Sequence, residues 1–268
     1  MKKTLIGIAA IAALMGTPAL GADMALKAPP PPEPVWNWTG FYVGGNLGGK
    51  WADTSGSVFM GGATGFGITT PAGTLPLAAA TAGTFMGGGQ FGYNWQVGAV
   101  VFGLEADVDG HNWSTTRTAA GTGLPAVFIP GDSFSVDSQW QASLRARLGY
   151  AFDHTLLYVT GGPAWTGVNV NTNFIATTAG GFLFPASSAS DSRTLTGGTV
   201  GGGIEYAIVK NWTIGLEGRY TWYGSATYNG GSVAAIAGSP TGPYVLAPAT
   251  QTLSLSTAEV LGKINFKF

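Results

Sequence analysis

The chain has 268 residues, of which only 9% are charged and 45% are hydrophobic, and its formal net charge is −1. Soluble domains typically carry roughly 25% charged residues, so this composition is too apolar for an ordinary surface in water. A net charge near zero excludes an electrostatic basis for nucleic-acid binding. The absence of cysteine excludes disulfides and thiolate sites.

Residues 1–22 have the pattern of a secretory signal peptide. Lys2 and Lys3 precede an apolar run from Leu5 to Met15, which is too short to span a bilayer because a spanning helix needs about 20 residues. Small residues at the end of this segment offer a cleavage site, and a buried N-terminal helix is the alternative. Residues 23–37 contain the proline-rich stretch KAPPPPEPV, which predicts an extended periplasmic tether.

Eight later segments alternate with period two, as strands do when their two faces meet different environments. Four links between them are roughly 25–30 residues long and rich in Gly, Ala, Thr and Ser, whereas three are only a few residues long. No later stretch is apolar enough for a spanning helix, so a closed barrel is the remaining way to cross a membrane. The expected strands are Phe41–Trp51, Thr84–Gln96, Val100–Gly110, Gln139–Phe152, Thr155–Val168, Thr194–Ile208, Trp212–Tyr223 and Thr252–Phe268.

These features predict an all-β fold for residues 38–268. The expected architecture is an eight-stranded antiparallel up-and-down transmembrane β-barrel with long outer loops and short periplasmic turns. An even number of strands places both ends of the chain on the periplasmic side, which suits an exported chain.

Tryptophan placement is a second indication of a membrane barrel. All nine tryptophans fall at ends of the expected segments, as two interfacial girdles require, because indole combines an apolar body with one polar N–H. A soluble eight-stranded calyx is the alternative, and the low charge argues against it. The expected girdles comprise Trp36, Trp38, Trp95 and Trp212 at the periplasmic rim, and Trp51, Trp113, Trp140, Trp165 and Trp222 at the outer rim.

The charged residues of the expected strands lie on the face opposite to the apolar one. Arg or Lys on the lipid side costs about 2–4 kcal/mol near the midplane, so these side chains should point into the lumen, where balanced pairs are favoured. Because eight strands leave an interior that side chains can just fill, we expect a self-neutralising plug. A narrow passive channel for small solutes is the alternative. The expected lumen charges are Lys50, Arg145, Arg147, Arg219, Lys263 and Lys267, with Glu105, Asp107, Asp109, Glu205, Glu217 and Glu259.

Motifs for catalysis and ligand binding are weak. The GGGQFG stretch has dinucleotide-loop spacing but no helix follows it, and DVDG lacks the remaining ligands of a calcium loop. An outer-membrane hydrolase would need a base near the outer rim. His111 is the candidate, because His154 lies in a turn at the opposite rim. A solvated histidine is the simpler interpretation of His111, so we predict no catalytic residue, no metal and no cofactor.

Four stretches are similar to those of a known family: WTGFYVGGNLGGKW (38–51), SLRARLGYAFDHTLLYVTGGPAW (143–165), TVGGGIEYAIVKNWTIGLEGRYTWYG (199–224) and the closing LGKINFKF. On these motifs the chain resembles the RopB-type outer-membrane barrels of alphaproteobacteria, also described as outer membrane immunogenic or porin-family proteins. The resemblance implies a Gram-negative source and a location in the cell outer membrane. For activity it implies a non-catalytic structural or surface role, or loosely a porin.

The resemblance also implies a route to the membrane. Phe266 and Phe268, at the end of the last strand, would form the signal through which the barrel assembly machinery recognises the chain and inserts it into outer-membrane lipid. A monomer is the default expectation for a small barrel.

Overall fold

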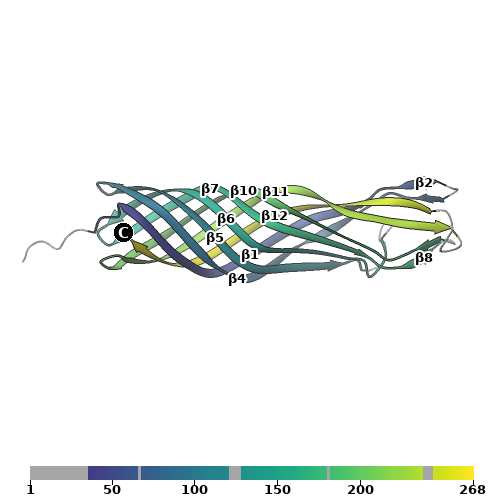
Figure 1. Ribbon diagram of the computed structural model, residues 1–268, viewed down its shortest axis with the longest axis horizontal. Coiled ribbons are helices and arrows are strands. Elements are labelled where there is room, and N and C mark those ends of the chain that lie inside the picture. Colours follow the sequence, from purple (N-terminus) through teal and green to yellow (C-terminus); the bar gives the residue numbers. More distant parts are fainter. Residues whose placement is uncertain (1–35, 66–67, 121–127, 180–181, 238–243) are drawn as a thin grey trace, which may run out of the picture. The chain divides into compact units, whose positions relative to one another are not determined.

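The computed structural model describes residues 36–65, 68–120, 128–179, 182–237 and 244–268 (Figure 1). The predicted signal peptide, 1–22, and all of the predicted tether except Trp36 and Asn37 lie outside the described residues. No helix in the described part of the chain is long and apolar enough to cross a membrane.

Eight long antiparallel strands form a closed ring (Figure 1). The hydrogen-bonded order is β10-β7-β6-β5-β4-β1-β12-β11, and pairing between β10 and β11 completes the ring. The predicted eight-stranded barrel is therefore confirmed, and its last strand pairs with the first. The long strands are β1 (Gly40–Met60), β4 (Gly73–Val97), β5 (Val100–Thr118), β6 (Ser133–Phe152), β7 (Thr155–Phe174), β10 (Ser187–Val209), β11 (Trp212–Ala237) and β12 (Tyr244–Lys267).

Short turns join the strands at one end of the barrel, and short hairpins extend them at the other. The turns at 98–99, 153–154 and 210–211 have two residues each, as predicted. Gly98 and Asp153 have positive φ angles of 62° and 54°, which two-residue hairpin turns favour. The hairpins are formed by β2 (Ala63–Gly65) with β3 (Ile68–Thr70) and by β8 (Thr177–Ala179) with β9 (Phe182–Phe184).

The prediction of long outer loops is wrong in its extent, because the strands continue far into the expected loops. The first strand ends at Met60 rather than Trp51, the next begins at Gly73 rather than Thr84, and the last begins at Tyr244 rather than Thr252. Small residues dominate these stretches, and they permit the antiparallel ladder to propagate because each added residue satisfies further backbone groups.

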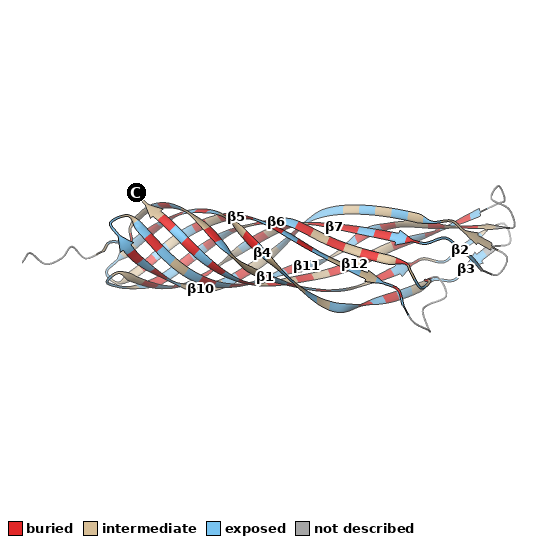
Figure 2. Cartoon of the chain, turned by 90° about the horizontal axis from the view of Figure 1, so that it is seen from below, coloured by how far each residue is buried: buried red, intermediate tan, exposed pale blue. Residues whose placement is uncertain are grey.

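Buried and exposed residues alternate along the strands (Figure 2), and the residue types on the two faces divide the barrel into two halves. The membrane half extends from the two-residue turns to the level of Trp51, Trp140 and Trp222, and its outward face is an apolar band of Phe, Leu, Ile, Val, Tyr and Trp. Beyond that level lies the outer half. On β12, for example, buried Glu259 alternates with exposed Val260 in the membrane half, whereas buried Leu253 alternates with polar Ser254 in the outer half.

The outer half is a sandwich of two sheets, because two of the eight ladders stop early. Pairing between β4 and β5 ends at Met86 and His111, and pairing between β10 and β11 ends at Gly197 and Tyr223. Four strands, β4-β1-β12-β11, thus form one sheet, and β5-β6-β7-β10 form the other. Apolar side chains from both sheets pack between them, including Val58, Leu253 and Leu255 with Phe134, Val136, Val168 and Phe174.

Candidate functional site: the charged core of the barrel

The membrane half holds its charged side chains inside. Eleven of the expected lumen charges come from six strands and are each at most 5% exposed. They share one face of each strand because residues two apart point the same way. We call this set the charged core: Lys50, Glu105, Asp107, Asp109, Arg145, Arg147, Glu205, Glu217, Arg219, Glu259 and Lys263.

Arg145 is the centre of the charged core. One terminal nitrogen lies 2.5 Å from a Glu105 oxygen and 3.0 Å from Asp107, and the other lies 2.5 Å from Glu217. Lys263 contacts the same two glutamates, with its Nζ 2.7 Å from Glu105 and 3.1 Å from Glu217. Since Glu105 is on β5 and Glu217 is on β11, these cations cross-link strands that are not neighbours in the ring. The planar guanidinium suits such multiple contacts.

Arg219 forms a second centre next to Arg145. Its two terminal nitrogens lie 2.9 Å from Asp107 and 3.0 Å from Asp109, and its Nε lies 3.1 Å from Glu259. Asp107 thus accepts from both arginines. Removing one cation would leave this network with an excess of buried negative charge, and breaking buried ion pairs costs more than intact pairs stabilise.

At the periplasmic end of the charged core, aromatic and aliphatic side chains close the interior. Arg147 pairs with Glu205, and its guanidinium carbon lies 3.6 Å from the centroid of the Tyr158 ring. Trp38 and Leu156, which are 2% and 0% exposed, pack with Tyr158 in an apolar cluster. The lumen is therefore filled on both sides of Arg147.

Neutral donors complete the network, and our sequence analysis missed them. The Tyr42 hydroxyl donates to Glu105 at 2.8 Å, the Tyr158 hydroxyl to Glu217 at 2.8 Å, and the Ser143 hydroxyl to Asp107 at 2.6 Å. Each lies on the inward face of its strand, so alternation could have placed them inside. Alternation carries no information on which carboxylate each hydroxyl would reach.

Inward glycines make room for the core side chains. A Cβ atom at Gly92 would collide with the Tyr42 hydroxyl, and one at Gly203 would collide with the Tyr158 hydroxyl. These glycines therefore do not leave the lumen empty, because neighbouring side chains occupy the space that the missing Cβ atoms provide.

At the outer edge of the charged core, Lys50 and His111 face the interior. Lys50 Nζ lies 2.5 Å from Gln141 Oε1 and 3.9 Å from Glu259. His111 Nε2 lies 3.4 Å from Lys50 Nζ and 3.0 Å from Ser138 Oγ, and His111 is only 8% exposed. The expectation of a solvated rim histidine is thus wrong, because His111 belongs to the buried face of β5.

The structure corrects two members of the predicted girdles. Trp38 and Trp113 are each 2% exposed and lie inside the barrel. Trp113 lies two residues after His111 and four after Asp109 on β5, so it shares their inward face. Extending the predicted strand beyond Gly110 would have placed Trp113 correctly. Six predicted girdle tryptophans do lie on the outward face. They are Trp51, Trp95, Trp140, Trp212 and Trp222, which are 40–60% exposed, and Trp165, which is partly buried.

The charge balance also differs from the predicted six of each sign. Lys267 lies at the periplasmic rim, where its ammonium donates to the Asn37 carbonyl and sits 5.1 Å from the centroid of the Trp36 ring. Trp36, which we also assigned to the periplasmic girdle, is partly buried and packs edge-on against Trp38 at 5.9 Å. The charged core therefore contains five basic and six acidic residues.

The chain ends in an aromatic cluster at the same rim. The Phe266 ring lies 5.2 Å from that of Trp212 and 5.3 Å from that of Phe268. Phe268 is 72% exposed, and its backbone N–H donates to the Phe41 carbonyl at 3.0 Å. The last residue thus still belongs to the β1–β12 ladder.

The strands form a closed ring with an apolar outward band and a charged interior, and two-residue turns join them at the end of the barrel where the chain ends. These features define an integral outer-membrane β-barrel. The family model described as outer membrane protein beta-barrel domain matches residues 9–238. The chain belongs to this family, and it is a protein of the cell outer membrane.

Curated relatives come from alphaproteobacteria, as the sequence resemblance predicted. The chain is 34% identical over 220 residues to the 31 kDa outer-membrane immunogenic protein of Brucella melitensis, covering 80% of this chain and 85% of the relative. It is 30% identical over 201 residues to the 22 kDa outer membrane protein of Rhizobium leguminosarum, covering 74% and 71%. Among solved structures, OprG of Pseudomonas aeruginosa aligns over 87% of this chain and 97% of its own, with 12% identity and a TM-score of 0.43.

Proposed function

We propose that this protein is a closed, non-catalytic barrel that anchors a folded outer sandwich in the outer membrane, where the sandwich serves in surface interactions. The observation that supports this proposal is the filled interior. The apolar cluster around Trp38, the charged core, and the apolar interior of the outer half follow one another along the lumen. Ion pairs that connect strands across the lumen resist displacement by solutes, because separating the two ions leaves buried charges unpaired.

Conductance in planar bilayers tests the closed lumen. The wild-type barrel is first shown to be folded by its different migration on gels with and without boiling. After insertion, we expect it to give no reproducible conductance steps. The double variant Arg147→Ser/Glu205→Ser removes a buried pair together and widens the lumen, so it should give steps or frequent openings. Asp191→Ser/Arg193→Ser, which removes a partly exposed pair in the outer half, is the matched control. Steady steps from the wild type would overturn the closed barrel and favour the passive porin.

The non-catalytic part of the proposal is supported by the position of His111. A general base must reach the proton that it abstracts, and His111 faces Lys50 and Ser138 in the interior. We expect the wild type to hydrolyse neither lipid esters nor peptides in detergent or vesicles. Hydrolysis that His111→Ala abolishes, with Lys50→Met as the neighbouring control, would contradict the proposal.

The partners that follow are outer-membrane lipid and the barrel assembly machinery, with the monomer as the working state. The proposal that Phe266 and Phe268 act as the assembly signal is supported by their rim position and by the exposure of Phe268. Deleting Phe268 should lower membrane assembly more than Phe268→Tyr, as measured by the fraction of heat-modifiable barrel in purified outer membranes. Equal assembly of all three forms would remove this role.

A further inference from the structure

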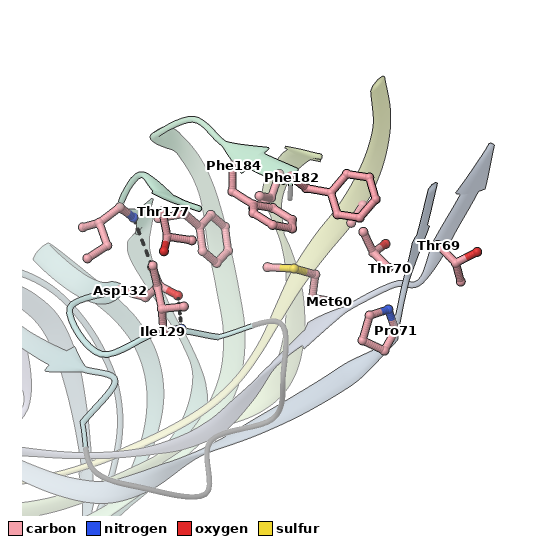
Figure 3. Close-up of a pocket in the computed structure, with 13 residues that line it drawn as sticks. Met60, Thr69, Thr70, Pro71, Ile129, Asp132, Thr177, Phe182 and Phe184 are labelled. Atoms are coloured by element: carbon pink, nitrogen blue, oxygen red, sulfur yellow. Dashed lines mark hydrogen bonds between the residues drawn. The ribbon is translucent and has the colours of Figure 1, made fainter. Parts of the chain in front are cut away.

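The outer half ends in an apolar cavity that neither the charged core nor the proposed function uses. Its volume is about 110 Å³. It lies between the two sheets of the sandwich, because Met60, Val233 and Ala247 come from one sheet and Phe174 from the other, while Phe182 comes from the β8–β9 hairpin. Figure 3 shows Met60 reaching into the space between Phe182 and Phe184 on one side and Ile129 and Asp132 on the other.

A buried carboxylate builds one wall of this cavity. Asp132 is 1% exposed and accepts hydrogen bonds from the backbone N–H groups of Ile129 at 3.0 Å and Ile175 at 3.1 Å (Figure 3). It therefore ties the turn that precedes β6 to the segment that follows β7. Gly131 has a φ of 111°, and a Cβ there would come within 2.7 Å of Ile175 Cδ1. The wall is thus preformed, which lowers the entropic cost of binding.

The two buried polar residues of the wall, Asp132 and Thr70, are already engaged, which restricts the kind of ligand. The two Asp132 oxygens hold the two amides described above, and the Thr70 hydroxyl bonds to the backbone N–H and carbonyl of Ala63 at 2.9 and 3.3 Å. A ligand that must form hydrogen bonds would lose those it makes in water without replacement. Apart from Thr69 and Thr177, the remaining surface is aliphatic, aromatic and thioether, and Met60 can adapt to the shape of a guest.

The charge at the wall restricts the ligand further. Asp132 is the only ionisable residue among the described residues that line the cavity, and in the described part of the chain no basic side chain forms a salt bridge with it. Burial raises the pKa of the Asp132 carboxyl, although the two backbone N–H donors oppose this shift. An anionic ligand would be repelled by Asp132 and would also lose its hydration in the apolar cavity. A neutral molecule avoids both costs.

We propose that this cavity binds a small uncharged apolar molecule, about the size of one aromatic ring, from the outer side of the membrane. An apolar cavity of about 150 Å³ in another protein stays dry and holds benzene. The present cavity is of similar size and has a mouth, since Thr69, Pro71 and Ile175 at its rim are exposed whereas Met60 and Phe174 are buried.

Methionine-methyl NMR on the full chain in lipid nanodiscs tests this proposal. With ¹³C-methyl methionine, the Met60 signal reports on the cavity, and the signal of Met86, which is 2% exposed on β4, serves as the internal control. Both signals are assigned through Met→Leu variants. Titration with toluene should shift Met60 saturably and leave Met86 unchanged. Benzoate, the matched anion, should bind at least about tenfold more weakly, because transfer of its charge is unfavourable.

Two variants separate the cavity from partition of toluene into lipid. Ala247→Phe places a ring inside and should abolish the saturable shift, whereas Leu246→Phe, on the exposed face of the same strand, should leave it intact. A Met60 shift that grows linearly with toluene and matches that of Met86 would overturn the proposal. Equal affinity for benzoate and toluene would also overturn it. If Ala247→Phe failed to fold, the comparison of Met60 with Met86 in the wild type would still decide.

Discussion

The membrane half and the outer half of this barrel are built by the same strands, yet their interiors have opposite chemistry. In the charged core of the membrane half, the inward residues are ions and hydroxyls and the outward residues are apolar. In the outer half, Leu253, Val136 and Phe134 point inward, while Ser254 and Asn169 are on the outward side. Alternation between a buried and an outward face continues along the strands, with register shifts on several of them, and the solvent around the two halves differs. Lipid requires an apolar exterior, whereas water permits an apolar core to form by the hydrophobic effect.

The two interiors should therefore respond differently to substitution. In the membrane half, stability depends on keeping every buried ion paired. In the outer half, it depends on the apolar volume between two sheets. Four experiments can sharpen or break this distinction.

The largest effect is expected in the charged core. Arg145→Met removes a cation that Glu105, Asp107 and Glu217 share, and breaking buried ion pairs in this way costs about 3–5 kcal/mol. Urea unfolding in lipid vesicles, followed by heat-modifiable gel migration, measures the loss. Arg193→Met, at an exposed pair with Asp191, should change stability by less than about 1 kcal/mol. Equal stability of Arg145→Met and the wild type would contradict a core that depends on paired ions.

A smaller loss is expected from the apolar interior of the outer half. Leu253 is 0% exposed, and Leu253→Ala should cost about 2–5 kcal/mol through lost burial and the resulting cavity. The loss should appear as faster proteolysis of the outer half while the membrane half keeps its heat-modifiable fold. Ser256→Ala, on the outward face of the same strand, should stay within about 0.5 kcal/mol of the wild type. Simultaneous unfolding of both halves would show that they form one cooperative unit.

Tryptophan positions give a spectroscopic test with little change in stability. Brominated lipids quench indoles that face the bilayer. Because Trp222 is 48% exposed on the outward face and Trp113 is 2% exposed inside, Trp222→Phe should reduce the quenched fraction of the emission and Trp113→Phe should increase it. The opposite order would restore Trp113 to the outer girdle and exclude it from the interior.

The smallest effect is a pH dependence at the outer tip. Burial raises the pKa of Asp132, so docking of its turn favours the protonated carboxyl. The stabilisation is then complete below the ordinary aspartate pKa of about 3.9 and is lost as pH rises through the raised value. Hydrogen-exchange protection of the Ile129 and Ile175 amides should fall between pH 3.5 and 7 in the wild type. Asp132→Asn should show no such change, and a matching fall in that variant would exclude Asp132 as the cause.

Much of the membrane half could be predicted from the sequence, because its determinants are local. Strand alternation placed Glu105, Asp107 and Asp109 on one face, and the structure has all three inside. The outer half was harder to predict. Its residues are small and weakly patterned, so Gly73–Gly83 looked like a loop, although pairing with β1 makes it a strand. Such pairing depends on a partner distant in the sequence, which no local pattern reports.

By itself, the sequence determined the class of this protein: an exported, charge-poor chain with eight alternating segments can satisfy its backbone in lipid only by closing into a barrel. Tertiary structure decided the rest. It determined that Trp38 and Trp113 lie inside, that Arg145 links Glu105 to Glu217 across the lumen, and that two sheets enclose a cavity beside Asp132. The physical reason is that the side on which a residue points is a property of its own strand, whereas the groups it meets there come from strands across the barrel.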